Sequence, residues 1–136
     1  MTNVVLQMQE LAGGYGGGQV LNGVTLQLHA AEVLGLIGRN GVGKTTLMRT
    51  LIGVVPAKQG QILLGEIDIT QASPQRRARL GIGYVPQGRE VFTGLTVSEN
   101  LQVGMQFVRE HREFAKEMLD RVLDYFPILR QRLKQK

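Results

Sequence analysis

One short run of the sequence combines glycines, a lysine and two threonines at spacings that suit phosphate binding. The run consists of Gly38, Arg39, Asn40, Gly41, Val42, Gly43, Lys44, Thr45 and Thr46. Up to its first threonine it matches the pattern G-x-x-x-x-G-K-[ST] in full. Glycines let the backbone curl so that successive N–H groups point inward, and a following helix adds partial positive charge at its N-terminus. The run therefore predicts a phosphate-binding loop, and the alternative is an ordinary glycine turn followed by a lysine.

The three side chains that end this run have distinct expected roles. Lys44 is placed to reach the β- and γ-phosphates of a nucleoside triphosphate. The Thr45 hydroxyl is placed to ligate Mg²⁺, which prefers oxygen ligands, and Thr46 can offer a second hydroxyl to an outer phosphate. The run thus predicts binding of a triphosphate together with its magnesium ion.

A loop that binds phosphates does not distinguish one nucleotide base from another, so an aromatic side chain that stacks on the base would be needed as well. Tyr15, which lies in the glycine-rich stretch GGYGGG, is one candidate, because an aromatic ring can stack on a base. From the residues alone, a turn residue that packs on a strand is an equally good interpretation of Tyr15.

The segments around the loop have the order strand, loop, helix. Apolar residues alternate with polar ones over 4–8 and 24–28, which predicts half-buried antiparallel strands. The run 33–37 is apolar without alternation, as in a parallel strand that is buried on both faces. Over 44–52 the apolar residues share one helical face, and Gly53 is placed to end that helix.

The rest of the chain contains further short elements. The pattern predicts a hairpin over 62–69, a basic helix from Ser73, and a second short buried strand over 82–85. A capping box over 96–99 predicts the start of a helix. A second amphipathic helix is expected over 114–126.

Composition limits the classes of site that the chain can hold. It has 136 residues, 43% of them hydrophobic, which suits one domain with its own core. There is no cysteine, so disulfides and thiolate metal sites are excluded. Apolar runs fall far short of the roughly 18 residues that cross a bilayer, and the N-terminus lacks the apolar core of a signal peptide. The net charge is +5, but no aromatic residues accompany the basic ones, so no nucleic-acid partner is expected.

Three stretches together resemble the ATP-binding subunit of an ATP-binding cassette (ABC) importer: GGYGGGQVLNGVTLQL, GRNGVGKTT and GYVPQGREVFTGLTVSENL. The segment 86–92 is similar to the subunits that energise uptake of branched-chain amino acids or urea. The resemblance implies an α/β fold of the P-loop NTPase class, of which this chain would be the N-terminal part. An antiparallel β subdomain and parallel core strands would occupy 1–94, and the start of a helical subdomain would occupy 95–136.

The resemblance also implies roles for single residues and for partners. Tyr15 would be the aromatic residue that stacks on adenine, and Gln87, otherwise an ordinary turn residue, would be the Q-loop ligand of Mg²⁺. Arg89 and Phe92 would lie near a transmembrane permease subunit. ATP and Mg²⁺ would be the cofactors. A second ATP-binding subunit would complete the site, and the protein would be cytoplasmic and peripheral on the inner face of the membrane, without contact with the transported solute.

Three motifs of the resembled family do not occur in the sequence: the L-S-G-G-Q signature, the acidic strand that ends in aspartate and glutamate, and the switch histidine. The resemblance therefore implies no catalytic residue here, and ATP binding without efficient hydrolysis by this chain. It also implies that the strands over 33–37 and 82–85 lack the strand that would lie between them. The alternatives are a P-loop NTPase outside transport and a non-catalytic nucleotide-binding fragment.

Overall fold

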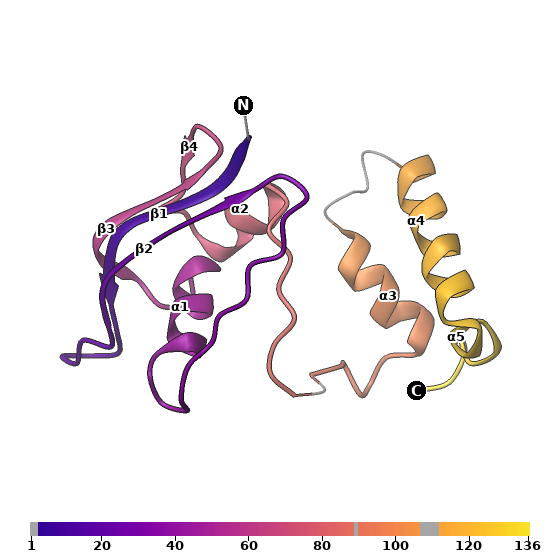
Figure 1. The fold of residues 1–136 in the computed structure, drawn as a ribbon. Coiled ribbons are helices and arrows are strands. Elements are labelled where there is room, and N and C mark those ends of the chain that lie inside the picture. Colours follow the sequence, from indigo (N-terminus) through magenta and orange to yellow (C-terminus); the bar gives the residue numbers. More distant parts are fainter. Residues whose placement is uncertain (1–2, 89, 107–111) are drawn as a thin grey trace. The chain divides into compact units, whose positions relative to one another are not determined.

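An antiparallel sheet with the strand order β2-β1-β3-β4 dominates the first part of the protein (Figure 1). The computed structural model describes residues 3–88, 90–106 and 112–136, which divide into two compact units, Met1–Tyr84 and Val85–Lys136. The strands are β1 (Val4–Gly13), β2 (Leu21–His29), β3 (Ala57–Leu64) and β4 (Ile67–Asp68). The antiparallel pairing predicted for the two alternating segments is confirmed, as is the hairpin formed by β3 and β4.

A bulge interrupts β1 on both of its edges. The register shifts between Met8 and Leu11 against β2, and Glu10 has φ 46°. The Glu10 N–H donates instead to the Thr25 hydroxyl at 3.0 Å. On β3, Gly60 lies so close that an added Cβ would clash with the Glu10 carbonyl oxygen, and its φ is +83°. The bulge brings successive residues at the end of β1 into the interior, just before the glycine-rich turn.

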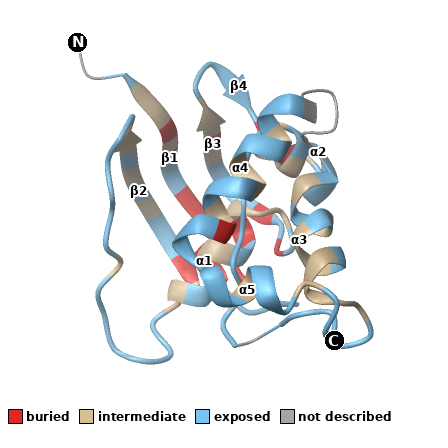
Figure 2. Ribbon diagram, turned by 90° about the vertical axis from the view of Figure 1, so that its right-hand side faces the viewer, coloured by how far each residue is buried: buried red, intermediate tan, exposed pale blue. Residues whose placement is uncertain are grey.

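The helix α1 (Lys44–Leu51) packs on the sheet and completes the core of the first unit (Figures 1 and 2). Its apolar face carries Leu47, as predicted. The buried cluster that Leu47 joins also contains Leu6, Met8, Leu11, Leu21, Ala57, Ile62 and Ile69. α1 ends where predicted, because Gly53 follows the C-cap with φ 82°, a conformation that suits glycine.

A buried arginine ties the second helix to the end of the first. The helix α2 (Pro74–Arg79) begins after Ser73, whose hydroxyl accepts from the Arg76 N–H. Arg77, only 3% exposed, donates through Nη1 to the carbonyls of Thr50 at 2.7 Å and Leu51 at 2.6 Å. Its Nε and Nη2 each donate at 2.9 Å, to the carbonyls of Ala72 and Thr70. Burial lowers the pKa of Arg77, although arginine stays charged in proteins.

The two predicted buried strands do not form in the described residues. Residues 33–37 and 82–85 have no ladder partner there, and the connector between β2 and α1 is exposed over most of its length (Figure 2). Val33 is 96% exposed and Ile37 is 99% exposed. The prediction was wrong for this chain because a strand becomes buried on both faces only when neighbouring strands pair with it and helices cover it.

Helices make up the second unit: α3 (Val97–Met105), α4 (Arg112–Tyr125) and α5 (Pro127–Gln131). The predicted capping box is confirmed, since the Thr96 side chain accepts from the Glu99 N–H while the Glu99 carboxylate accepts from the Thr96 N–H. The unit begins at Val85, and Asn100 of α3 binds the backbone of the loop that precedes this helix. The subdomain boundary expected after residue 94 stays a prediction.

Replacing Arg77 should destabilise the first unit. Arg77→Met would leave four carbonyl acceptors without their donor, which we expect to cost about 3 kcal/mol in the free energy of unfolding. The free energy of unfolding of Arg77→Lys should lie between those of wild type and Arg77→Met, because one ammonium reaches fewer of these oxygens. Urea denaturation measures the effect. The control is Arg79→Met, on an exposed position of the same helix, and an equal loss in both methionine variants would contradict the role assigned to Arg77.

Removing the hydroxyl of Thr50 should have the opposite effect. Thr50 is fully buried, and among the described residues its Oγ1 finds no hydrogen-bond partner. A buried unpaired hydroxyl is unfavourable, so we expect Thr50→Val to raise the free energy of unfolding by about 1 kcal/mol. Thr50→Ser keeps the hydroxyl and loses the methyl, so it should be less stable than wild type. A valine variant that unfolds at lower denaturant would show that the hydroxyl is satisfied.

Candidate functional site

The predicted phosphate loop lies directly before α1. Gly41 and Gly43 have φ 84° and 104°, so two loop glycines occupy the left-handed region that favours this residue. Gly43 is the N-cap of α1 and offers no side-chain oxygen to the first helical N–H groups, and the first turn has no acidic residue. The Leu47 N–H is the first in the helix to reach a backbone acceptor, the Gly43 carbonyl, at 2.8 Å. The N–H groups ahead of it are therefore available to an anion.

Lys44 folds back over the loop that precedes it. Its Nζ donates to the carbonyl oxygens of Gly38 and Arg39, both at 2.6 Å. Thr45 is exposed and Thr46 is buried at 7% exposure. The loop thus gathers a cation, open helix N–H groups and an accessible hydroxyl. This donor set fits the triphosphate and the magnesium ion that the sequence predicts.

A magnesium site here would depend on few protein ligands. Within the described ranges no three His, Asp or Glu side chains come together in a way that could hold a metal ion. Mg²⁺ commonly takes one or two protein oxygens and completes its octahedron with phosphate and water, which suits the exposed Thr45 hydroxyl. Gln87, the second predicted ligand, is exposed in the second unit, so its ligation of Mg²⁺ stays a prediction.

Tyr15 lies at the corner of the turn between β1 and β2. Its side chain is 48% exposed, and its hydroxyl accepts a hydrogen bond from Nη1 of Arg49, a residue of α1, at 3.3 Å. This hydrogen bond raises the pKa of Arg49. A half-exposed ring is compatible both with stacking on a base and with an ordinary place in a turn, so the adenine-stacking role stays a prediction.

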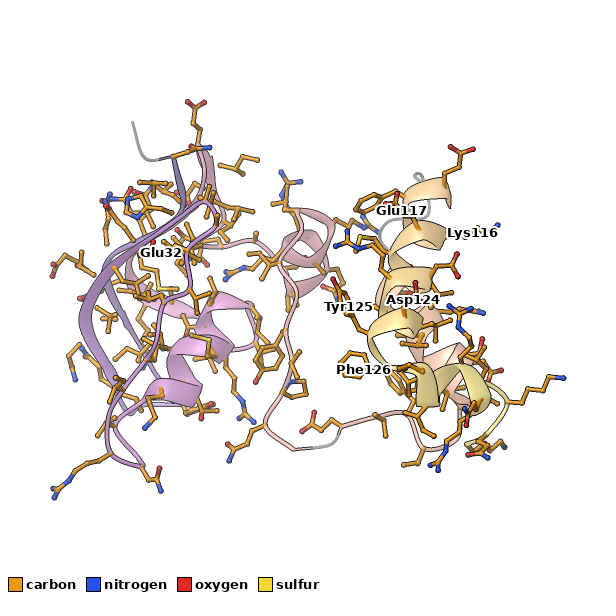
Figure 3. The ribbon with its side chains drawn as sticks, turned by 45° about the vertical axis from the view of Figure 1, so that its right-hand side comes forward. Glu32, Lys116, Glu117, Asp124, Tyr125 and Phe126 are labelled. Atoms are coloured by element: carbon orange, nitrogen blue, oxygen red, sulfur yellow. The ribbon has the colours of Figure 1, made fainter. Side chains whose placement is uncertain are left out.

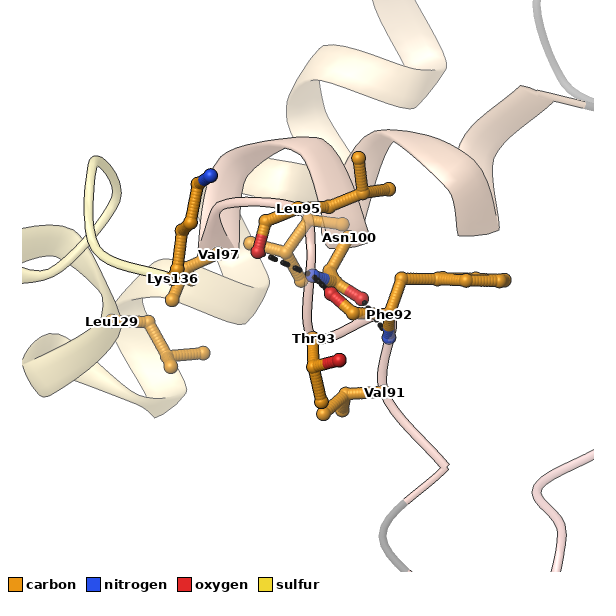
Figure 4. A pocket seen from close by; sticks show the side chains of 9 residues that line it. Val91, Phe92, Thr93, Leu95, Val97, Asn100, Leu129 and Lys136 are labelled. Carbon is orange, nitrogen blue, oxygen red and sulfur yellow. Dashed lines mark hydrogen bonds between the residues drawn. The ribbon is translucent and has the colours of Figure 1, made fainter.

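The segment predicted to face a permease lies in the second unit. Phe92 is 58% exposed, whereas Arg89 lies outside the described residues. Asn100 anchors this segment: its Oδ1 accepts from the Phe92 N–H at 2.9 Å, and its Nδ2 donates to the Phe92 carbonyl at 3.1 Å (Figure 4). Nδ2 also lies 3.3 Å from the Leu95 carbonyl oxygen and 3.0 Å from that of Thr96. No pattern in the sequence predicted this role of Asn100.

Beside Phe92 the second unit forms an open, largely apolar groove of about 620 Å³ (Figure 4). Its lining residues are Val91, Phe92, Thr93, Leu95, Val97, Asn100, Leu101, Leu129 and Lys136. The predicted contact residue Phe92 therefore belongs to a larger surface that could receive an apolar side chain. Whether a permease subunit contacts it stays a prediction.

Aromatic residues are exposed where α4 meets α5. Tyr125 is 70% exposed and Phe126 58% exposed, and the two follow one another at the end of α4 (Figure 3). Pro127 begins α5, and Nη2 of Arg130 pairs with Oδ1 of Asp124 at 2.8 Å across this corner. Among the described residues no helix is long and apolar enough to cross a membrane.

The comparison with protein families agrees with this geometry. Residues 21–135 match the ABC transporter family. The chain belongs to this family. The match includes the phosphate loop, α1, and nearly all of the helical unit of this ABC transporter domain.

Curated relatives of the ABC transporter domain are ATP-binding proteins. A probable ABC transporter ATP-binding protein of Azorhizobium caulinodans is 42% identical over 87% of the chain and 42% of its own length. A probable branched-chain amino acid transport ATP-binding protein, LivF, of Archaeoglobus fulgidus is 36% identical over 97% of the chain and 55% of its own length. The lipopolysaccharide export system ATP-binding protein LptB of Escherichia coli is 40% identical over 74% of the chain and 42% of its own length.

Solved structures support the same fold. The ATP-binding subunit of an ABC transporter superposes with a TM-score of 0.82 at 28% identity, over 95% of this chain and 52% of that one. A nucleotide-free ATP-binding cassette from an ABC transporter, 21% identical, superposes with a TM-score of 0.75 over 97% of this chain and 57% of that one. The fold is therefore the N-terminal part of an α/β ABC ATPase. The ABC transporter domain described here spans about half the length of the relatives it matches.

The capping box of α3 makes a pH-dependent contribution to stability. The Thr96 N–H, and then its hydroxyl, lower the pKa of the Glu99 carboxyl below its ordinary 4.5. Because the folded pKa is depressed, this stabilisation is complete above pH 4.5 and is lost as the pH falls through the folded pKa. We expect Glu99→Gln to lower the thermal midpoint at neutral pH and to reduce its decline in acid, followed by circular dichroism. Ser98→Ala should keep the wild-type pH dependence, and a Glu99→Gln profile parallel to wild type would contradict the assignment.

Proposed function

We propose that this chain is the ATP-binding, N-terminal part of the subunit that energises an ABC transporter, and that residues 38–46 bind the phosphates of Mg-ATP. The observation that carries the proposal is the uncapped start of α1, where Lys44 and open N–H groups converge behind Gly41 and Gly43. The fold and the family relationship support it, because the relatives are themselves named ATP-binding proteins.

The loop residues would act together on the triphosphate. The N–H groups at the start of α1 would donate to phosphate oxygens, and Lys44 would exchange its two carbonyl acceptors for the β- and γ-phosphates. Thr45 would ligate Mg²⁺ and Thr46 would face an outer phosphate. When bound, Mg²⁺ neutralises phosphate charge and holds the outer phosphates in one arrangement.

The remaining proposed contacts follow from the family relationship. Tyr15 would stack on adenine, and Gln87 would complete the magnesium site. Arg89 and Phe92 would contact a transmembrane permease subunit, and the apolar groove beside Phe92 supports this because it offers a receptive surface. A second ATP-binding subunit would pair with this one, and the assembly would place it on the cytoplasmic face of the membrane.

For the transported solute we propose branched-chain amino acids or urea. The segment 86–92 and the LivF relative support this choice. The LptB relative, by its name, serves lipopolysaccharide export, so a similar domain also occurs in a transporter of another kind. The energising subunit does not contact the solute in this proposal, and exchange of the permease partner would change the substrate.

Removing the Lys44 ammonium tests the proposed phosphate grip. We expect wild type to bind Mg-ATP in isothermal titration calorimetry and Lys44→Ala to bind at least about tenfold more weakly, since charge-assisted hydrogen bonds are lost. Lys116→Ala, at an exposed position of α4, is the control and should bind like wild type. No detectable binding of Mg-ATP by wild type would contradict the proposed function.

The same proteins test whether the 136-residue chain hydrolyses ATP. The family's acidic strand, whose terminal glutamate would orient the attacking water, does not occur in the sequence. We therefore expect binding without measurable steady-state phosphate release, in contrast to a P-loop NTPase that works alone. Phosphate release by wild type that disappears in Lys44→Ala would show that this chain is catalytic by itself.

A further inference from the structure

The turn that carries Tyr15 is held in one shape by its own backbone. The Gly18 N–H donates to the Tyr15 carbonyl at 2.9 Å, and the Val20 N–H donates to the Gly13 carbonyl at 2.8 Å. Gly14 is packed so tightly that an added Cβ would clash with the Gly18 carbonyl oxygen. The tyrosine therefore projects from a closed turn, although the surrounding residues are mostly glycine.

A lysine on the neighbouring strand holds the same turn. Lys58 of β3 donates from Nζ to the Gly16 carbonyl at 3.0 Å and lies 3.4 Å from the Gly18 carbonyl oxygen. Across the part of the chain that the structure describes, Lys58 forms no ion pair, so these carbonyls are its polar partners. Its ammonium therefore holds the tip of the turn through backbone carbonyls.

Arg49 holds the ring itself. It lies in the last turn of α1, and its Nη1 donates to the Tyr15 hydroxyl. A hydrogen bond to a phenol oxygen forms at the ring edge, so it orients the ring without itself covering either face. The side chain remains 48% exposed, which is consistent with a free face.

We propose that Arg49 is a positioning residue that holds the Tyr15 ring ready to receive the nucleotide base, with Lys58 fixing the turn that carries it. The inference rests on the proposed function, since it requires a nucleotide in the loop over 38–46. Because α1 begins at Lys44, five residues before Arg49, one helix positions both the phosphate grip and the base platform. Five residues of helix separate the backbone of Lys44 from that of Arg49 by about 7.5 Å along the axis of α1.

The proposal predicts an effect on base binding that spares phosphate binding. A ring that is ordered before binding lowers the entropy cost of association. Loss of the Arg49 hydrogen bond that orders it should therefore weaken Mg-ATP binding roughly two- to tenfold. Tyr15→Phe keeps the ring but removes the acceptor for Arg49, so it should show the same weakening as Arg49→Met. In the double variant the two losses should not add, because both remove one contact.

The test compares two ligands by isothermal titration calorimetry: Mg-ATP, and magnesium tripolyphosphate, which has no base. Arg49→Met should weaken Mg-ATP binding roughly two- to tenfold and change tripolyphosphate binding by less than twofold. Arg49→Lys, which keeps a cationic donor, should recover part of the loss. Arg79→Met, an exposed arginine of α2, is the matched control and should bind both ligands like wild type.

The outcomes separate this proposal from the proposed function. If wild type binds neither ligand, nucleotide binding itself fails. If wild type binds both and Arg49→Met binds Mg-ATP with wild-type affinity, Arg49 does not position the base platform. Equal weakening of both ligands would also overturn the inference, because Arg49 would then act through the stability of α1.

Discussion

The guanidinium of Arg77 is the constraint around which the first unit is organised. Four carbonyl oxygens converge on it, from the end of α1 and from the chain that leads into α2. The carbonyls at a helix C-terminus have no partner within the helix and carry partial negative charge. A rigid cation with several donors satisfies them without a carboxylate, and this explains how an arginine can be buried here. The space for it is left by Gly53, where a Cβ would lie 3.0 Å from Nε of Arg77.

This arrangement matters for the candidate site because α1 is fixed at one end and carries the candidate phosphate loop at the other. At its C-terminus the helix is fixed by Arg77 and packs on the sheet through Leu47. At its N-terminus it presents Lys44 and open N–H groups. A cation at one end and an anion at the other both match the helix dipole. A short helix of 8 residues is marginal by itself, so its tertiary contacts determine whether the phosphate loop has a defined shape.

Local patterns in the sequence predicted the elements whose causes are local. The capping box at Thr96 and the helix end at Gly53 depend on residues within a few positions, and both are present. The apolar runs over 33–37 and 82–85 predicted buried strands, but burial needs neighbouring strands, and no described residue pairs with them. Long-range pairing leaves no mark in the local pattern of a run, so the pattern alone could not predict whether these runs are paired. Arg77 looked like one of several basic residues on a helix, since its acceptors lie 5 to 27 residues away. The candidate phosphate loop could be predicted from the sequence because its glycines and lysine fall within seven consecutive positions, from Gly38 to Lys44.

The contacts of Lys44 have a further consequence for how the loop behaves. Its ammonium donates to the Gly38 and Arg39 carbonyls, so two backbone oxygens occupy the hydrogen-bond donors that would otherwise be open to a phosphate. An incoming anion would then compete with two backbone oxygens for protons that are already engaged. The heat released on binding would report the difference between charged and neutral acceptors, and not the full strength of an ammonium–phosphate bond. Lys44 thus holds the loop closed through the Gly38 and Arg39 carbonyls, and a bound phosphate would take the place of these two acceptors.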